Sequence, residues 1–227
     1  MTIVPMMQTS CSELRAVFST ISADSCPHRY NFHLHTVCSD GRLAPEQLIQ
    51  QAIARGLTGL AITDHHSVKG YRAAQQWLEQ WRQQHPDQST PTLWSGVEIS
   101  ADLGGGEVHI LGYGFDPNHR ALLPYLLGYT SIDEDYPAAQ VIWAIHQAGG
   151  LAVLAHPARY RRSPTEVVAI AADLGIDGVE TYYCYNNPKV WQPSPEPARE
   201  IGALAQAHDL LETCGTDTHG GDIFQRL

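Results

Sequence analysis

The sequence of 227 residues predicts an α/β fold, a single barrel-like domain in which helices cover a mainly parallel sheet. Apolar runs that fit buried strands alternate with amphipathic helical segments, which is the pattern of parallel strands joined by crossover helices. Seven candidate strands favour a barrel over an open sheet. Histidines and acids also recur just past the carboxyl ends of these strands, on the face where such folds place their active sites.

The candidate elements follow one another in order along the chain. Strands are predicted at residues 30–35, 57–63, 92–97, 107–115, 151–155, 178–182 and 210–215. Helices are predicted between them at residues 45–56, 68–85, 138–148, 164–174 and 196–208. In the first of these helices Pro45 opens the segment, apolar residues follow at helical spacing and Gly56 ends it. Residues 1–28 carry a weaker helical pattern, which predicts a helical extension packed on a main domain of residues 29–227.

Composition argues against several classes of protein. With 43% hydrophobic residues, the chain can build one substantial core. Its net charge of −10 would repel a long nucleic acid, unless a local cationic centre overrides the field. The five cysteines show no C-x-x-C spacing, so we expect reduced thiols in the cytoplasm and neither a disulfide framework nor a zinc ribbon. No signal-peptide pattern and no apolar run of the roughly 20 residues that span a bilayer is present, so we expect no membrane association.

The twelve histidines are a large number for a chain of this length, and they are spread along it. His33 and His35 lie two residues apart at the end of the first predicted strand, so their imidazoles project from the same face and can reach one cation. Asp40 adds an oxygen ligand nearby. A lone His-x-His pair also occurs on plain exposed strands, so this pair by itself leaves that alternative open.

A larger set of polar residues lies at or near the predicted strand ends. Its members are His33, His35, Asp40, His65, Glu98, His109, His156, Asp217 and His219. Nine nitrogen and oxygen ligands are too many for one ion but suffice for two or three, and imidazole with carboxylate suits Zn, Mn or Fe better than calcium or magnesium. Two members have an alternative: Asp40 also fits a turn residue before Gly41, and His109, inside its strand, also fits a buried core histidine.

The motifs that carry these residues resemble the PHP (polymerase and histidinol phosphatase) family over residues 31 to 219. In order they are His33-x-His35, Ser39-Asp40-Gly41, Thr63-Asp64-His65, Gly96-Val97-Glu98-Ile99, His109-Ile110-Leu111-Gly112, Ala155-His156-Pro157 and Asp217-x-His219. The resemblance implies a distorted (β/α)7 barrel with a trinuclear metal centre at the carboxyl ends of its strands. It also implies metal-dependent phosphoester hydrolysis, and the complete ligand set favours an active enzyme.

The resemblance further implies how the ligands divide among the metals. One metal takes His33, His35, Glu98 and Asp217. A second shares Glu98 and takes His109 and His156. A third takes Asp40, His65 and His219. A hydroxide held between metals near Glu98 is then expected to attack the phosphate ester.

Within the family, the motifs around His65, Glu98 and His156 are most similar to small phosphoesterases that include nucleoside 3′,5′-bisphosphate phosphatases. We therefore expect hydrolysis of a phosphate monoester of a small molecule, such as a nucleotide. Two features depart from that subgroup. Residues 110–155 leave no room for the sizeable helical insertion that those relatives carry, and His66 stands where Asp or Asn is common.

Further residues are candidates for handling the substrate. Arg159 follows His156 by three residues and can clamp a phosphate, although it also fits a surface ion pair. Lys69 and Arg161 are further phosphate-binding candidates, with Arg162 and Lys189 behind them. Asp64 and His66 flank a ligand, and each fits either a proton donor or a group that orients the ligand.

The same reasoning leaves other assignments open. Glu180, on the strand of residues 178–182, is expected to have a structural or ligand-orienting role. Residues 183–197 form the longest loop after a strand on the active-site face and are the first candidate for a lid. Two other functions remain as alternatives: a phosphodiesterase or exonuclease acting on short nucleic acid ends, and a non-catalytic, regulatory metal-binding module.

Overall fold

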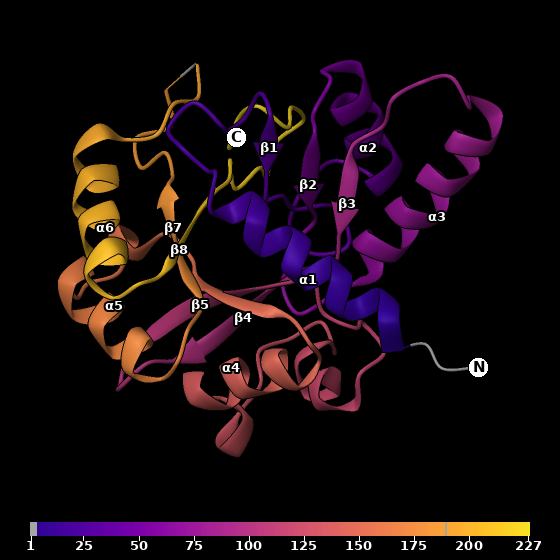
Figure 1. Ribbon diagram of the computed structural model, residues 1–227. Coiled ribbons are helices and arrows are strands. Elements are labelled where there is room, and N and C mark those ends of the chain that lie inside the picture. The colour runs from indigo at the N-terminus through magenta and orange to yellow at the C-terminus, as the bar shows by residue number, and fades with distance from the viewer. Residues whose placement is uncertain (1–3, 189) are drawn as a thin grey trace.

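A computed structural model describes residues 4–188 and 190–227, and it contains two sheets with helices on their outer faces (Figure 1). The first sheet has the order β1-β2-β3 and consists of β1 (Tyr30–Asn31), β2 (Gly59–Ala61) and β3 (Thr92–Trp94). The second has the order β4-β5-β6-β7-β8 and consists of β4 (Gly96–Asp102), β5 (Glu107–Tyr113), β6 (Leu151–Leu154), β7 (Gly178–Tyr182) and β8 (Leu211–Cys214).

Every predicted helix is present, with ends that differ from the prediction by a few residues at most for those between strands. The helices are α1 (Val4–Phe18), α2 (Pro45–Ala54), α3 (Lys69–Gln84), α4 (Ala138–Gln147), α5 (Pro164–Asp173) and α6 (Pro195–Ala207). Short 3-10 helices are η1 (Arg120–Tyr125), η2 (Asp133–Asp135) and η3 (Pro157–Arg159). Figure 1 shows α2 and α3 beside the first sheet, and α5 and α6 beside β7 and β8. Among the described residues no helix is long and apolar enough to cross a membrane.

The distorted (β/α)7 barrel that the family resemblance implies is not confirmed, because the regular strands among the described residues form two separate ladders. The predicted strand of residues 92–97 is interrupted at Ser95, so that β3 belongs to the first sheet and β4 to the second. Gly96 follows that interruption and lies so close to the backbone of Ile62 that an added Cβ would collide with its carbonyl oxygen. β5 is antiparallel to both β4 and β6. The loop between β4 and β5 is too short for a crossover helix, which accounts for the first of these pairings.

Isolated backbone contacts join the two sheets at two seams. At one seam, Asp217 N–H donates to the His33 carbonyl oxygen at 2.9 Å and His35 N–H donates to the Thr218 carbonyl oxygen at 3.1 Å. At the other seam, His65 and Glu98 form a parallel bridge. Several of the predicted ligands, among them His33, His35, His65 and Asp217, therefore lie at the seams, whereas Glu98 and His109 lie within β4 and β5.

Helix α1 packs across the sheets through buried aromatic contacts. The Phe18 ring lies 4.9 Å from the Phe32 ring and 5.5 Å from the Tyr113 ring, centroid to centroid, in edge-to-face arrangements. Such pairs add to the burial of apolar area. Whether residues 1–28 form a unit apart from residues 29–227 stays a prediction.

The loop of residues 183–197 is anchored at several points. Tyr183, Cys184 and Trp191 are buried, and α6 begins at Pro195, inside the predicted loop. Its role as a lid stays a prediction. All five cysteines are unpaired.

Candidate metal centre

The fold brings the nine candidate ligands close to one another. Eight of them form three groups in which one nitrogen or oxygen atom per residue lies within 4.8 Å of the others. The groups are His33, His35, Glu98 and Asp217; His35, Asp40, His65 and His219; and His65, Glu98 and His109. The ninth, His156, places its Nε2 atom 3.3 Å from Glu98 Oε1. Since His35, His65 and Glu98 each belong to two groups, the three groups interlock.

Glu98 lies at the middle of the arrangement, with its side chain 1% exposed. Its Oε2 atom is 3.0 Å from His33 Nε2 and 3.1 Å from His35 Nε2. Its Oε1 atom is 2.7 Å from His109 Nδ1. Because each oxygen faces a different set of imidazoles, this carboxylate has the geometry of a bridge between two cations.

Asp217 also divides its two oxygens. Oδ1 faces the ligand set, 3.2 Å from His35 Nε2 and 3.4 Å from His33 Nε2. Oδ2 faces away and accepts hydrogen bonds from Tyr183 Oη at 2.7 Å, Arg226 Nε at 2.8 Å and Arg159 Nη1 at 3.2 Å. Neither Tyr183 nor Arg226 was a candidate from the sequence. Tyr183 directly follows β7, a position that could have drawn attention to it, whereas Arg226 lies in an irregular segment with no motif.

Asp40 forms the most open part of the centre. Its side chain is 52% exposed, and its Oδ2 atom lies 3.1 Å from His219 Nε2 and 3.8 Å from His65 Nε2. The hydrogen bond from His219 lowers the pKa of Asp40 although partial burial opposes this. Beside Asp40 and His65 opens a cavity of about 400 Å³, whose lining also includes Ser100, Tyr129 and Thr130.

Burial and neighbouring carboxylates shift the pKa values of His33 and His35 in opposite directions. Burial disfavours the charged form of His33, yet Glu180, Glu98 and Asp217 together raise its pKa well above the ordinary value. The same balance raises the pKa of His35 to about 9. Since a metal ion binds the neutral imidazole, protons compete with metal ions for these rings.

His65 behaves differently from His33 and His35. Its pKa falls to about 4, because burial disfavours the charged form and the neighbouring imidazoles of His35 and His109 add repulsion. A neutral imidazole is the form that binds a metal ion, so His65 is ready for that role without losing a proton.

Several ring nitrogens in the centre have no hydrogen-bond partner. Both Nδ1 and Nε2 of His35 are buried without a partner of suitable geometry, and so is Nδ1 of His156. Leaving such atoms unsatisfied costs about 1–3 kcal/mol each. Together with the mixed imidazole and carboxylate donor set, this shows that the residues present fit divalent transition metals.

Three residues in or beside the centre adopt left-handed backbone conformations. The φ angles are 49° at His66, 30° at His156 and 54° at Asp217. Such conformations are uncommon outside glycine and asparagine, and each costs about 1–3 kcal/mol. The fold thus holds backbone strain at the residues that present or flank the ligands.

Glu180 orients two of the ligands, as expected. It is fully buried, its Oε1 atom lies 2.9 Å from His33 Nδ1, and its Oε2 atom accepts the His156 backbone N–H at 2.9 Å. A carboxylate on the second ring nitrogen of a ligating histidine fixes the ring orientation.

The Asp64 carboxylate forms its hydrogen bonds with residues outside the ligand cluster. Its Oδ1 atom accepts hydrogen bonds from Thr36 N–H at 2.7 Å and Ser39 Oγ at 2.8 Å, and its Oδ2 atom accepts from Thr36 Oγ1 at 2.7 Å. These bonds hold the loop that carries Asp40. The geometry therefore favours the orienting role for Asp64 over proton donation.

His66 likewise links neighbouring segments. Its Nε2 atom accepts the Ser100 backbone N–H at 3.2 Å, and its carbonyl oxygen accepts the Gly128 N–H at 2.9 Å. A nitrogen that accepts a hydrogen bond carries no proton, so Nε2 of His66 is not a proton donor in this arrangement.

The phosphate-binding candidates lie in different places. Arg159 contacts Asp217 at the centre, and the exposed Arg161 lines a cavity of about 560 Å³ together with Arg159, Tyr160 and Arg162. Lys69 is exposed at the start of α3, and the contacts of the described residues do not link its ammonium group to the ligand set. Lys189 lies outside the described residues.

Comparison with known proteins identifies related sequences. A family model described as "PHP domain" matches residues 31–156, which is more than half of the chain. The 5′-3′ exoribonuclease Rnm of Salmonella typhimurium is 26% identical, over 84% of this chain and 85% of that protein. The 3′,5′-nucleoside bisphosphate phosphatase of Chromobacterium violaceum is 35% identical, over 54% of this chain and 39% of that protein.

Solved structures share the fold. An amidohydrolase from Chromobacterium violaceum, with bound sulfate and no metal, superposes with a TM-score of 0.70 at 22% identity over 86% of this chain and 90% of that chain. A protein from Bifidobacterium adolescentis assigned as a metal-dependent phosphoesterase superposes with a TM-score of 0.66 at 25% identity over 86% and 89% of the two chains.

This chain is shorter than the exoribonuclease within the region they share. The alignment has 261 positions, whereas 84% of 227 residues is about 191 residues, so about 70 positions have no counterpart here. The shared part of the two proteins is therefore interrupted by segments that this chain lacks.

Proposed function

Because the chain belongs to the PHP domain family and is a metal-dependent phosphoesterase, we propose that it hydrolyses a phosphate monoester of a small molecule, such as a nucleotide. The observation that carries this proposal is the position of Glu98, whose two oxygens face different histidines within three interlocking ligand groups. The alternative of a non-catalytic regulatory module is set aside, because the family matches support a hydrolase.

We further propose that the nine ligands hold two to three divalent ions of Mn, Fe or Zn. The first set is His33, His35, Glu98 and Asp217; the second is Glu98, His109 and His156; the third is Asp40, His65 and His219. The first set coincides with one of the groups of neighbouring atoms, and the third lies within another. Bound in this way, the ions supply a nucleophilic water and neutralise charge that develops on phosphate oxygens.

The residues of the chain then have distinct tasks. Glu98 and Asp217 hold the ligand sets together. Glu180 fixes the ring of His33 and the backbone of His156. Arg159, 41% exposed and next to Asp217, binds oxygens of the substrate phosphate, which a guanidinium can do with two parallel hydrogen bonds.

The cavity that Arg159 lines supports the proposal of a small substrate. Its volume of about 560 Å³ lies within the usual range of ligand pockets, and its lining holds three arginines, Arg159, Arg161 and Arg162, against one acid, Glu107. Tyr160 connects it to the centre, because its hydroxyl accepts the His109 backbone N–H at 2.9 Å. An anionic group of a nucleotide fits this cavity while its ester lies at the ligands.

A second candidate function is 5′-3′ exoribonuclease activity on short RNA ends. Relatives with that name align with 84% of this chain, a larger share than the phosphatase does. The net charge of −10 and the missing segments argue against a long RNA substrate.

One experiment separates the two candidates. Protein loaded with Mn is given a nucleoside 3′,5′-bisphosphate and, separately, a 5′-phosphorylated oligoribonucleotide, and the products are resolved by chromatography. We expect inorganic phosphate from the bisphosphate at the higher kcat/KM. Mononucleotides released from the oligonucleotide at the higher kcat/KM would establish the second candidate instead, and no turnover of either substrate would contradict both.

A further inference from the structure

Arg226 reaches the candidate metal centre from a segment that follows the last motif. The segment is fixed by its backbone: the Ile223 carbonyl oxygen accepts hydrogen bonds from Asn31 Nδ2 at 2.9 Å and Thr216 Oγ1 at 3.0 Å. The His219 N–H donates to the Arg226 carbonyl oxygen at 2.6 Å. The two bonds to Ile223 are buried, and together the three tie the segment to β1 and to the loop after β8, so Arg226 is held in a defined place.

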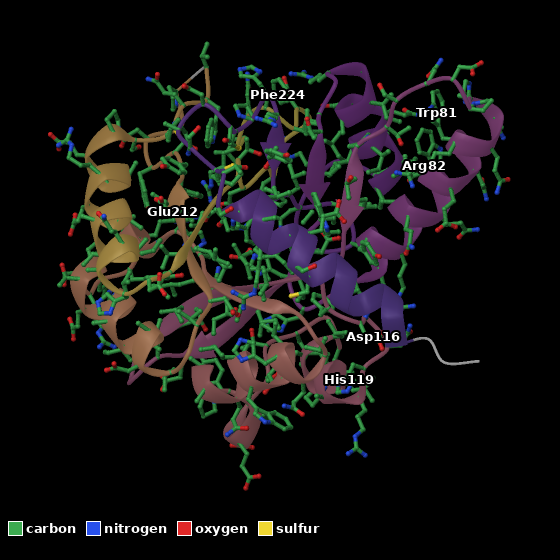
Figure 2. All side chains as sticks on the ribbon, viewed as in Figure 1. Trp81, Arg82, Asp116, His119, Glu212 and Phe224 are labelled. Atoms are coloured by element: carbon green, nitrogen blue, oxygen red, sulfur yellow. The ribbon has the colours of Figure 1, made fainter. Side chains whose placement is uncertain are left out.

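A second anchor lies farther from the centre. The guanidinium of Arg55 lies 4.2 Å from the ring centroid of Phe224, which is labelled in Figure 2, and pairs with Asp222 at 2.9 Å. Arg55 therefore supports the same segment without touching Asp217. This makes it a matched control for Arg226.

At Asp217 the chain places more positive charge than one carboxylate neutralises. Arg226 Nε and Arg159 Nη1 lie 2.8 and 3.2 Å from the same oxygen, Oδ2, and the Tyr183 hydroxyl lies 2.7 Å from it. Two guanidinium groups and one carboxylate leave a surplus of one positive charge at the edge of the ligand set. Orienting Asp217 alone does not require a second guanidinium, since Tyr183 already donates to the same oxygen.

The Arg226 side chain is partly exposed. Its exposed fraction is 19%, and it borders a cavity of about 200 Å³ with Asn187 and Trp191. It bonds to Asp217 through Nε and also to Tyr183, and the planar guanidinium fork has further N–H donors beyond these two contacts. That fork matches the oxygens of a phosphate group.

We propose that Arg226, together with Arg159, binds the terminal phosphate of the substrate and selects a dianionic monoester over a monoanionic diester. This inference rests on the proposed phosphoesterase function. A terminal phosphate has three oxygens that are free to accept hydrogen bonds and carries about −1.5 to −2 charge at neutral pH. A diester has two such oxygens and one negative charge, so it cannot satisfy both guanidinium groups and the metal ions together.

The test compares Arg226→Gln with Arg55→Gln in protein loaded with Mn. Three quantities are measured: metal ions per chain, the Kd of inorganic phosphate by calorimetry, and kcat/KM for p-nitrophenyl phosphate and for its methyl diester. We expect Arg226→Gln to keep its metal and to weaken phosphate binding about 10- to 100-fold, the usual effect of a lost charged hydrogen bond. Activity on the monoester should fall by a similar factor and activity on the diester far less, whereas Arg55→Gln should leave all three quantities near wild type.

The other possible results of this test decide between the proposed role of Arg226 and its alternatives. Unchanged phosphate affinity in Arg226→Gln, or equal losses on monoester and diester, would overturn the proposal. Loss of metal in both Arg226→Gln and Arg226→Lys would show that Arg226 only supports Asp217. If the wild-type protein turns over no ester but still binds phosphate through Arg226, the proposed function fails and the anion site stands.

Discussion

Two carboxylate clusters in this molecule, one partly buried around Asp177 and one buried around Glu98, differ in whether the chain itself completes them. Asp177 is paired with Arg15, lies 2.7 Å from His146 Nε2 and accepts the Ala152 backbone N–H at 2.9 Å. Glu98, by contrast, lies among imidazoles, some of whose ring nitrogens have no partner. The first cluster ties α1 and α4 to the residue that precedes β7, which is a structural task. The second leaves buried ring nitrogens without partners, which fits a site that binds cations.

Removing Glu98 should have the largest effect on the centre and on the difference between the two clusters. In Glu98→Ala the oxygens shared by two ligand sets are lost, so we expect fewer metal ions per chain and a fall in kcat/KM of about a thousand-fold or more, since metal ions supply several kcal/mol to such reactions. Metal analysis and phosphate release measure the two effects. An unchanged metal count would show that Glu98 is not a shared ligand.

Metal removal should destabilise the protein substantially. A ligand at 100 to 1,000 times its Kd adds about 3–4 kcal/mol to the free energy of unfolding. For a domain of this size that corresponds to a Tm lower by about 6–16 °C after chelation. Scanning calorimetry checks it, and the Asp177→Asn variant should show the same metal-dependent shift because its cluster is separate. Equal Tm values with and without metal would count against the centre.

Glu180→Gln should have a smaller effect on the same centre. The amide keeps the shape of the side chain but places an N–H₂ group against either His33 Nδ1 or the His156 N–H. We expect metal affinity or activity to fall about 10- to 100-fold, as for other groups that orient metal-binding histidines. Competition with a metal indicator measures the affinity, and wild-type values would contradict the orienting role.

Asp177→Asn should affect stability and leave the metal count unchanged. We expect a loss of about 1–2 kcal/mol, the usual worth of charged hydrogen bonds, because Arg15 is half exposed and contributes little. Although burial opposes it, the hydrogen bonds from His146 and Ala152 and the charge of Arg15 lower the pKa of Asp177.

The pH dependence of that stabilisation follows from the direction of the shift. A carboxyl with a lowered folded-state pKa stabilises fully above its unfolded pKa of about 3.9, and the gain is lost as pH falls through the folded value. Urea titrations between neutral pH and about pH 3 should therefore give a shallower decline for Asp177→Asn than for wild type. Parallel curves would show that Asp177 contributes nothing.

Local signals in the sequence predict the helices well, because their starts and stops depend on neighbouring residues. Pro45 and Pro164 each open a helix as expected. Strands were predicted less well. The first was expected over residues 30–35 but is regular only at Tyr30–Asn31, since the following residues bond in turn to Cys214, Thr218 and other parts of the chain.

That the nine candidate ligands lie close together could be predicted from their positions near strand ends and from the family motifs. Their division among metal ions stays a proposal. The environments of Asp64, Tyr183 and Arg226 could not be predicted, because they depend on contacts between segments far apart in the chain. Asp64 bonds to Thr36 and Ser39, 28 and 25 residues away. Arg226 depends on an irregular segment that Asn31 holds, 192 residues before Ile223.

The seams between the sheets have a consequence for how the protein opens. His33 and His35 extend from the first sheet, whereas Glu98 lies in β4 of the second. Ions shared by these residues would act as cross-links between two halves that few regular backbone bonds connect. Amide hydrogen exchange should then become cooperative across both halves in the loaded protein, while in the metal-free protein the first sheet, with its short strands, should exchange on its own.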